Sequence, residues 1–329
     1  MPASSLVPPN PALGALQALS ERQALAWPLA VAYSGGADSS ALLRAAVQLW
    51  PGQVRALHVN HGLQAAADDF QRACQTVCQA LGVPLSVLAV QAHPQPGQSP
   101  EDAARRARYR ALAEGAQAAG CAMVLLGQHA DDQVETVLMA LGRGAGLPGL
   151  SAMPERFERH GAVFLRPLLA LPGASLRAWL EAAGHSFMDD PSNADERFAR
   201  NKLRARLMPA LAEALPHYRQ TLARSARHAA QAQALLDEVA AEDLHQAGSP
   251  PLISALQQLS LARQANVLRH WLASVHGARP SAAQLEELQR QLAACTTRGH
   301  RIELRLADGQ LVREGQALAY RACPEGRSL

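Results

Sequence analysis

A short apolar run that ends in a glycine-rich polar loop constrains this chain more than any other feature. Leu29 to Tyr33 has the pattern of a buried strand, the loop Ser34-Gly-Gly-Ala-Asp-Ser39 follows it, and Ser40 to Trp50 has the pattern of a helix. Two glycines let the backbone approach a ligand closely and turn its N–H groups toward it. The start of the following helix adds further N–H donors and a positive dipole end. The segment therefore predicts a phosphate-binding loop.

The composition of this loop separates it from the common nucleotide-binding loop. It lacks the G-x-x-x-x-G-K-[ST] spacing and contains no lysine. It contains a carboxylate, Asp38, which would repel phosphates unless a divalent cation joined them, so the loop also predicts Mg²⁺. The alternative interpretation is a strand-to-helix turn of small residues with a serine cap. Six defined positions between a buried strand and a helix favour phosphate binding.

Apolar runs and helical patterns alternate through the first part of the chain. This alternation predicts an α/β fold, a Rossmann-like parallel sheet with helices on both faces. Ligands of such sheets bind at the carboxyl ends of the strands, where we expect three polar clusters to converge: Ser34–Ser39, His58–Gly62 and Gly127–Asp132. The expected strands are 29–33, 54–59, 85–90, 123–127 and 163–165, and the expected helices are 40–50, 68–81, 101–119 and 131–141.

The pattern of the sequence changes after Met208-Pro209, where the alternation of apolar runs and helical segments stops. An alanine-rich helical stretch, which Pro216 can interrupt, runs from Leu211 to Gln246, and further helices are expected over 252–273 and 281–293. Residues 301–306 alternate between polar and apolar side chains as a strand does, and 307–310 are typical of a hairpin turn. Residues 311–313 would form the returning strand. We therefore expect two domains, one over 1–215 and a smaller α+β domain over 216–329.

Composition narrows the class of protein. Hydrophobic residues are 48% and charged residues 18% of the 329 residues, which disfavours global disorder. An aromatic fraction of 4% argues against an extended stacking platform for single-stranded nucleic acid. The net charge of +3 permits a polyanionic partner without requiring one. Lys202 is the only lysine, and the many arginines have a planar guanidinium that suits phosphate.

Cysteine usage and the N-terminus favour a cytoplasmic enzyme. The five cysteines include no C-x-x-C pair, so we interpret them as small buried apolar side chains rather than metal ligands. Met1 to Pro11 has no basic start before an apolar run, so no signal peptide is expected. No apolar stretch is long enough to cross a bilayer, and no membrane partner is expected.

A second polar cluster, His129-Ala-Asp-Asp-Gln-Val-Glu-Thr136, begins the helix expected at 131–141. Asp132 and Glu135 share a helix face and form a compact anionic site for a metal or for the ammonium group of an amino acid. Acidic residues in a first turn are also favoured by the helix dipole alone, and Asp131 is interpreted as a cap. His129 can contact phosphate or carry a proton near neutral pH.

Further segments carry arginines. Arg105 and Arg108 share a helix face, Arg143-Gly-Ala-Gly146 is a glycine-rich turn, and Arg200-Asn-Lys-Leu-Arg204 follows the turn Asp190-Pro-Ser-Asn193. Phosphate or nucleic-acid contacts and an ordinary solvated surface are both open interpretations here. The basic residues of the long later helix are interpreted as a solvated face: Arg219, Arg224, Arg227 and His228.

Taken together, these motifs resemble those of the tRNA(Ile)-lysidine synthetase family, a branch of the N-type ATP pyrophosphatases, also called PP-loop enzymes. The resemblance covers residues 29 to 210, and the later region is similar to that family's helical and β-hairpin tRNA-binding part. Some members have a further C-terminal domain, which we do not expect in a chain of this length. The motifs in family order are Ser34–Ser39, His58-Val-Asn-His-Gly-Leu63, Ala104-Arg-Arg-Ala-Arg-Tyr109, His129–Thr136, Arg143–Gly146, Arg166-Pro-Leu-Leu169 and Asp190–Arg204.

The resemblance implies an adenine nucleotide alpha hydrolase-like fold and the use of ATP and Mg²⁺. ATP would adenylate the 2-position carbonyl oxygen of the wobble cytidine in the CAU anticodon of tRNA(Ile). The ε-amine of free L-lysine would then displace AMP and give lysidine. The modification would change codon reading from AUG to AUA.

The resemblance also assigns roles to single residues. Asp38 would hold Mg²⁺, Asp132 and Glu135 would recognise lysine or deprotonate its ε-amine, and Arg108 and Arg200 would bind phosphate or steady the adenylated intermediate. The implied catalytic residues are Asp38, Asp132, Glu135 and Arg200. The implied nucleotide-binding residues are Ser34, Gly35, Gly36, Ala37, Asp38, Ser39, His58, Arg108 and His129.

Three other functions stay open. A tRNA thiolating enzyme would share the ATP-binding domain but would typically need paired cysteines. An amide-forming adenylase that acts on a small carboxylate would not need the His129–Glu135 cluster. A non-catalytic tRNA- or nucleotide-binding protein would not need Ser34 and Asp38 intact. The sequence leaves the oligomeric state open, with a homodimer as one option.

Overall fold

The computed structural model describes residues 8–60, 67–90, 100–190, 195–297, 299–306 and 309–322. The chain forms two compact units, Met1–His228 and Ala229–Leu329. The division falls inside one long helix, α10 (Tyr218–Ala247). The domain boundary that we expected from the sequence, at 215/216, lies immediately before this helix.

The first unit contains a six-stranded sheet in the order β3-β2-β1-β4-β6-β5. Neighbouring strands are parallel except for β5 and β6, which are antiparallel. The strands are β1 (Leu29–Ala32), β2 (Val54–Asn60), β3 (Leu85–Ala89), β4 (Met123–Leu125), β5 (Arg156–Arg159) and β6 (Ala162–Leu165). The predicted α/β fold is confirmed. The sequence pattern missed the edge strand β5, because Phe157 is its only apolar residue.

Alternate residues of the strands face opposite sides of the sheet, and helices cover both sides. In β1, Leu29 and Val31 belong to one apolar core, and Ala30 belongs to another. The first core includes residues of α1 (Pro11–Arg22), α2 (Ala37–Leu49), α3 (Ala67–Leu81) and α7 (Gly173–Ala182), and the second includes residues of α4 (Pro100–Ala118). A parallel sheet with both faces covered requires such continuously apolar strands.

Local sequence determines where the helices next to the site begin. Pro11 occupies the first turn of α1, and the Asn10 side chain accepts a hydrogen bond from the Ala12 N–H at 2.9 Å. The same side chain donates to the Ala41 carbonyl of α2 at 2.8 Å, which ties the two helices together. Helix α2 begins at Ala37, earlier than predicted, so Asp38 lies in its first turn. Neither α1 nor α7 was predicted.

Short helices connect the sheet to α10. They are α5 (Ala130–Gly142), α6 (Leu147–Leu150), α8 (Ala199–Lys202), the π-helical turn Leu203–Leu207 and α9 (Met208–Ala214). The break expected near Pro216 is confirmed, because α9 ends at Ala214 and α10 begins at Tyr218. Tyr218 and Met208 pack on Val134 of α5 in a small buried cluster, so the start of α10 is anchored beside the helix that carries the second polar cluster.

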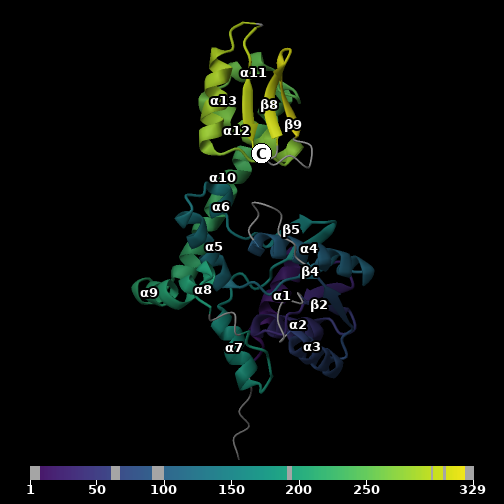
Figure 1. Cartoon of the computed structure of the whole chain (residues 1–329). Helices are drawn as coiled ribbons and strands as arrows, with labels where there is room; N and C mark the ends of the chain where they lie inside the picture. Colours follow the sequence, from purple (N-terminus) through teal and green to yellow (C-terminus); the bar gives the residue numbers. More distant parts are fainter. Residues whose placement is uncertain are drawn as a thin grey trace, which may run out of the picture. The chain divides into compact units, whose positions relative to one another are not determined.

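The second unit is an α+β fold of its own (Figure 1). Its core surrounds the buried Trp271 and includes residues of α11 (Ile253–Gln257), α12 (Leu261–His276) and α13 (Ala282–Ala294). The antiparallel strands are β7 (Glu303–Leu306), β8 (Gly309–Glu314) and β9 (Ala317–Ala322). The single helix predicted over 252–273 is wrong, because Ser260 caps a new helix start through the Arg263 N–H. Residues 307 and 308 of the predicted turn lie outside the described residues.

Among the described residues, we find no helix whose length and apolar character would let it span a membrane.

Candidate active site

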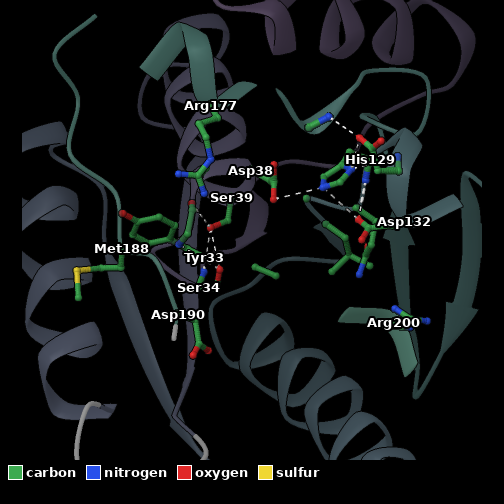
Figure 2. Close-up of a pocket in the computed structure, with 18 of the residues that line it drawn as sticks. Tyr33, Ser34, Asp38, Ser39, His129, Asp132, Arg177, Met188, Asp190 and Arg200 are labelled. Atoms are coloured by element: carbon green, nitrogen blue, oxygen red, sulfur yellow. Dashed lines mark hydrogen bonds and ion pairs between the residues drawn. The ribbon is translucent and has the colours of Figure 1, made fainter. Parts of the chain in front are cut away.

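A cavity of about 1100 Å³ opens at the carboxyl ends of β1, β2 and β4 (Figure 2). Residues of the Ser34–Ser39 loop, of His58–Asn60 and of Gly127–Asp132 line it, so the predicted convergence of these clusters is confirmed. His61–Leu63 and Pro191–Asn193 of the predicted motifs lie outside the described residues. Small-molecule pockets usually measure about 300–1,000 Å³, so this cavity has room for a nucleotide and part of a second substrate.

The phosphate-binding loop is held together by its own serines. The Ser39 hydroxyl accepts a hydrogen bond from the Ser34 N–H at 3.2 Å, donates to the Gly36 carbonyl at 3.1 Å and lies 3.0 Å from the Ser34 hydroxyl. Gly36, Ala37 and Asp38 line the cavity at the N-terminus of α2. The first N–H groups of a helix have no intrahelical acceptor, so the loop offers several donors to an anion.

Two positions in and beside this loop require glycine. Gly35 has φ +87°, and a Cβ atom there would lie 3.0 Å from the Cys74 sulfur. Its carbonyl accepts a hydrogen bond from the Met188 N–H at 2.9 Å. A Cβ atom at Gly127, which follows β4, would lie 3.2 Å from the Ser39 nitrogen. The first requirement was predicted from the Gly-Gly pair, whereas Gly127 was not singled out as a packing position.

Asp38 projects from the first turn of α2 toward the ring of His129, with 37% of its side chain exposed (Figure 2). Its Oδ2 lies 3.5 Å from His129 Nε2. Proteins usually hold Mg²⁺ with one or two carboxylates while phosphates and water complete the shell. An exposed carboxylate beside a phosphate-binding loop fits that arrangement. The described residues contain no group of three or more His, Cys, Asp or Glu that could bind a metal without such help.

His129 caps α5 through both its backbone and its ring. Its N–H donates to Asp132 Oδ2 at 3.0 Å, and its Nδ1 accepts from the Asp131 N–H at 3.3 Å. This reciprocal pattern is a capping box with histidine in the place of serine. A Cβ atom at Gly173 would come within 2.9 Å of the His129 ring, so the start of α7 closes over it. The cap therefore fixes the ring at the cavity wall.

Three carboxylates surround the His129 ring, which is 10% exposed. Nε2 lies 3.5 Å from Asp38 Oδ2 and 3.6 Å from Asp132 Oδ2, and Nδ1 lies 3.5 Å from Asp131 Oδ2. Burial disfavours the charged ring, but the hydrogen bond to Asp38 and the three negative charges outweigh it and raise the pKa of His129 to about 9. Nδ1 can accept the hydrogen bond from the Asp131 N–H only when the ring is neutral. When the ring is protonated, its Nδ1–H would instead face the Asp131 carboxylate.

Asp132 and Glu135 lie on the same face of α5, as predicted, but their surroundings differ. Asp132 lines the cavity, whereas Glu135 is fully buried and is not among the lining residues. Glu135 Oε1 accepts a hydrogen bond from Arg204 Nε at 2.9 Å and lies 2.7 Å from Arg204 Nη2. Burial raises the pKa of Glu135, and the Arg204 charge opposes that rise. The predicted contact of Glu135 with lysine stays a prediction.

Arg108, Arg200 and His58 also line the cavity. Burial lowers the pKa of Arg108. Arg200 Nε is buried and has no hydrogen-bond partner in the part of the chain that the structure describes. The Nδ1 atom of His58 lies 3.0 Å from the Tyr33 carbonyl, and burial lowers the pKa of this histidine, so a neutral ring donates to that carbonyl. Figure 2 places Arg200 on the side of the cavity where Asp132 lies.

Two ion pairs at the cavity wall were not predicted from the sequence. Arg177 donates to both oxygens of Asp189 at 2.6 and 3.1 Å. Arg219 Nε donates to Asp131 Oδ1 at 2.5 Å, while Asp131 Oδ2 accepts from the Gly173 N–H at 2.9 Å. The interpretation of Arg219 as part of a solvated face is wrong for this reason. These partners come from different helices and loops, and no local pattern joins them.

Comparison with known families matches both units. The PP-loop domain family matches residues 15–211, and the TilS substrate binding domain matches residues 252–319. Among solved structures, the U34-tRNA thiolase NcsA from Methanococcus maripaludis with its [4Fe-4S] cluster is similar, with a TM-score of 0.57, 15% identity, and coverage of 66% of this chain and 77% of that chain. At that identity the likeness concerns the fold alone.

Sequence comparison finds close relatives over most of the chain. The chain is 61% identical over 321 residues to the tRNA(Ile)-lysidine synthase of Polaromonas naphthalenivorans (strain CJ2), which covers 95% of this chain and 98% of that protein. It is 43% identical over 307 residues to the corresponding protein of Bordetella bronchiseptica, covering 90% and 88%. The match to the Burkholderia pseudomallei protein, 44% identical over 274 residues, covers 81% of this chain and 56% of that protein. The chain therefore belongs to the tRNA(Ile)-lysidine synthase family.

Proposed function

We propose that the protein joins free L-lysine to the 2-position of the wobble cytidine in the CAU anticodon of tRNA(Ile), with ATP converted to AMP and pyrophosphate. The observation that carries the proposal is the shared cavity, where the phosphate-binding loop and the acidic residues of α5 meet. Family membership over nearly the whole length of the Polaromonas relative supports the same reaction. The enzyme is thus a ligase that forms a carbon–nitrogen bond and changes codon reading from AUG to AUA.

The nucleotide would bind at the loop and the walls beside it. The N–H donors of Gly36 and Ala37 would contact the phosphates, with His58, His129 and Arg108 around them. Asp38 would hold Mg²⁺ together with those phosphates, and the metal would neutralise charge that develops on the departing pyrophosphate. The side chains of Ser34 and Ser39 shape the loop, since each is engaged in the hydrogen bonds that close it.

Lysine would bind on the acidic face of α5. Asp132 lies at the cavity, and one oxygen of the buried Glu135 has no hydrogen-bond partner among the described residues. A carboxylate there would attract the ammonium groups of lysine and would accept a proton from the attacking ε-amine, which is nucleophilic only when neutral. Arg200 would steady the adenylated cytidine from the same side of the cavity.

The second unit would supply tRNA recognition, since the matching family is described as a substrate binding domain. We propose that the functional division falls at 215/216, shortly before α10 begins. A cytoplasmic location fits an enzyme whose substrate is tRNA, and a homodimer is one option for its assembly. Sulfur transfer has no structural support, because the four described cysteines are buried and none lines the cavity.

Transfer of labelled lysine into an isoleucine tRNA transcript with the CAU anticodon tests the proposal. The reaction contains ATP and Mg²⁺, and the matched control is the elongator methionine tRNA transcript, which has the same anticodon. We expect label in the first and not in the second. The Asp132→Asn variant should lose lysine transfer at limiting lysine. If ATP is split to AMP and pyrophosphate but neither tRNA is labelled, the adenylating chemistry stands and the proposed substrate is wrong.

A further inference from the structure

Three arginine side chains gather around one tyrosine ring beside the cavity. The guanidinium carbons of Arg105, Arg108 and Arg159 lie 5.9, 5.7 and 5.2 Å from the centroid of the Tyr109 ring. Arg105 and Arg108 come from α4, and Arg159 ends the edge strand β5. Cations within about 6 Å of an aromatic centroid are attracted to the ring, so Tyr109 holds the three side chains together.

The ring of Tyr109 is itself fixed. Its hydroxyl accepts a hydrogen bond from Arg166 Nη2 at 3.1 Å, and the ring makes T-shaped contacts with Phe157 and Phe164. The buried Arg166 also donates hydrogen bonds to the Gln128 side chain and to the Pro154 carbonyl. Arg166 therefore has a structural role, and Tyr109 is a rigid support rather than a mobile surface ring.

The acidic side chains that the structure describes leave the charge on the three arginines uncompensated. In the part of the chain that the structure describes, no carboxylate forms an ion pair with Arg105, Arg108 or Arg159. Their neighbours on the same elements are paired, since Arg106 lies 3.6 Å from Asp102 and Arg156 lies 2.8 Å from Glu158. Three cations held close together without an anion are electrostatically unfavourable unless a ligand brings negative charge.

We infer that Arg105 and Arg159 form a phosphate-binding surface that contacts the backbone of the RNA substrate at the edge of the active-site cavity, next to Arg108. Arg108 lines the cavity, whereas Arg105 and Arg159 lie beyond its lining residues, and Arg105 is exposed. The surface thus leads from the cavity outward, which suits an extended polyanion. ATP phosphates share this chemistry, but the loop at Ser34–Ser39 already offers a site for them. The inference rests on the proposed RNA substrate.

The test compares two double variants of the full-length protein. Arg105→Gln/Arg159→Gln removes the unpaired charges outside the cavity, and Arg106→Gln/Arg156→Gln removes the paired arginines of the same helix and strand. The dissociation constant for the tRNA(Ile) transcript is measured from 50 to 300 mM KCl, and binding of a non-hydrolysable ATP analogue is measured in parallel. Each lost phosphate contact lowers the slope of log K against log salt by about 0.7–0.9, so the first variant should lose about 1.5.

The expected result is a weaker and less salt-dependent complex for the first variant, with unchanged binding of the ATP analogue. The control variant should retain the wild-type slope, and Arg105→Lys/Arg159→Lys should recover most of it. Equal slopes in both glutamine variants would overturn the inference, and loss of ATP-analogue binding would assign the surface to the nucleotide. The binding assay requires no lysine transfer, so failure of the proposed reaction would be seen separately.

Discussion

Arg204, which lines the cavity, forms an ion pair with the fully buried carboxylate of Glu135. Arg204 Nε and Nη2 lie 2.9 and 2.7 Å from the same oxygen, Oε1, of the fully buried carboxylate. Oε2 has no hydrogen-bond partner in the described structure. The Arg204 side chain is 43% exposed, and its Nη2 also lies 3.7 Å from Asp132 Oδ1. One guanidinium thus lies beside both carboxylates of the candidate lysine site, and the second oxygen of Glu135 stays buried without a hydrogen-bond partner among the described residues.

The Arg204→Met variant should therefore be less stable than the wild type. Removing Arg204 leaves the buried Glu135 carboxylate uncompensated. Such a loss costs about 3–5 kcal/mol when both partners are buried, and because Arg204 is exposed we expect a loss near the lower limit. The free energy of unfolding in urea measures it. The matched control is Arg206→Met, because Arg206 lies in the same π-helical turn and pairs with the exposed Glu196. That variant should lose less than about 1 kcal/mol, and equal losses would contradict the argument.

We also predict that Arg204 and Glu135 are coupled in their effects on the free energy of unfolding. In the Glu135→Gln background the buried charge is already absent, so Arg204→Met should cost less there than in the wild type. Residues in direct contact usually show non-additivity of about 0.5–3 kcal/mol, and we expect a value in the upper half of that range. The double-mutant cycle of unfolding free energies measures it. Additive losses would mean that the two side chains stabilise the protein independently.

The sequence predicted the sheet because strands with continuous apolar residues, such as Leu29–Ala32, leave few alternatives to a doubly covered parallel sheet. It also predicted which segments meet at the cavity, since the carboxyl ends of neighbouring parallel strands share one edge. Asp38, His129 and Asp132 were found this way. Each follows a strand by a few residues, so local spacing was sufficient.

Pairs formed across the fold could not be predicted in the same way. Glu135 and Arg204 are 69 residues apart, and Asp131 and Arg219 are 88 apart. Helix periodicity places each residue on a face, but it does not determine which face of another helix packs opposite. For this reason the sequence favours Glu135 as a ligand of a metal or of the substrate, whereas its main contact in the folded chain is Arg204.

Asp38→Asn should abolish ATP cleavage without unfolding the protein. The carboxylate faces the cavity and is partly exposed, so its loss removes a charge at the phosphates and little packing. We expect pyrophosphate release to fall at least about 100-fold, the usual effect of removing one electrostatic group from an active site. The control is Asp69→Asn, which removes an exposed acid from the first turn of α3. Normal turnover by Asp38→Asn would exclude the proposed role.

Stability should fall as the pH rises from about 6.5 to about 9. The pKa of His129 is raised to about 9 in the folded protein, above its ordinary value of 6.5. The contribution of His129 to the free energy of unfolding is therefore fully present below pH 6.5 and is lost as the pH rises through 9. The free energy of unfolding should fall by at most about 1.4 kcal/mol per pH unit from this group. Urea unfolding over this range measures the slope. His129→Asn, which retains a capping side chain, should show a flatter dependence. An unchanged slope would assign the effect to other groups.

Gly35→Ala should damage the phosphate-binding loop more than a comparable substitution elsewhere. Gly35 and Gly52 both have positive φ, +87° and +77°, so alanine at either position costs about 1–2 kcal/mol of backbone strain. Only at Gly35 does the new Cβ atom meet a neighbour, the Cys74 sulfur at 3.0 Å, whereas nothing lies within 4 Å at Gly52. We expect Gly52→Ala to retain pyrophosphate release and Gly35→Ala to lose it. Adding Cys74→Ala should restore part of the stability of Gly35→Ala by removing the contact. If the two alanine variants are equally active, the close packing behind the loop does not determine its geometry.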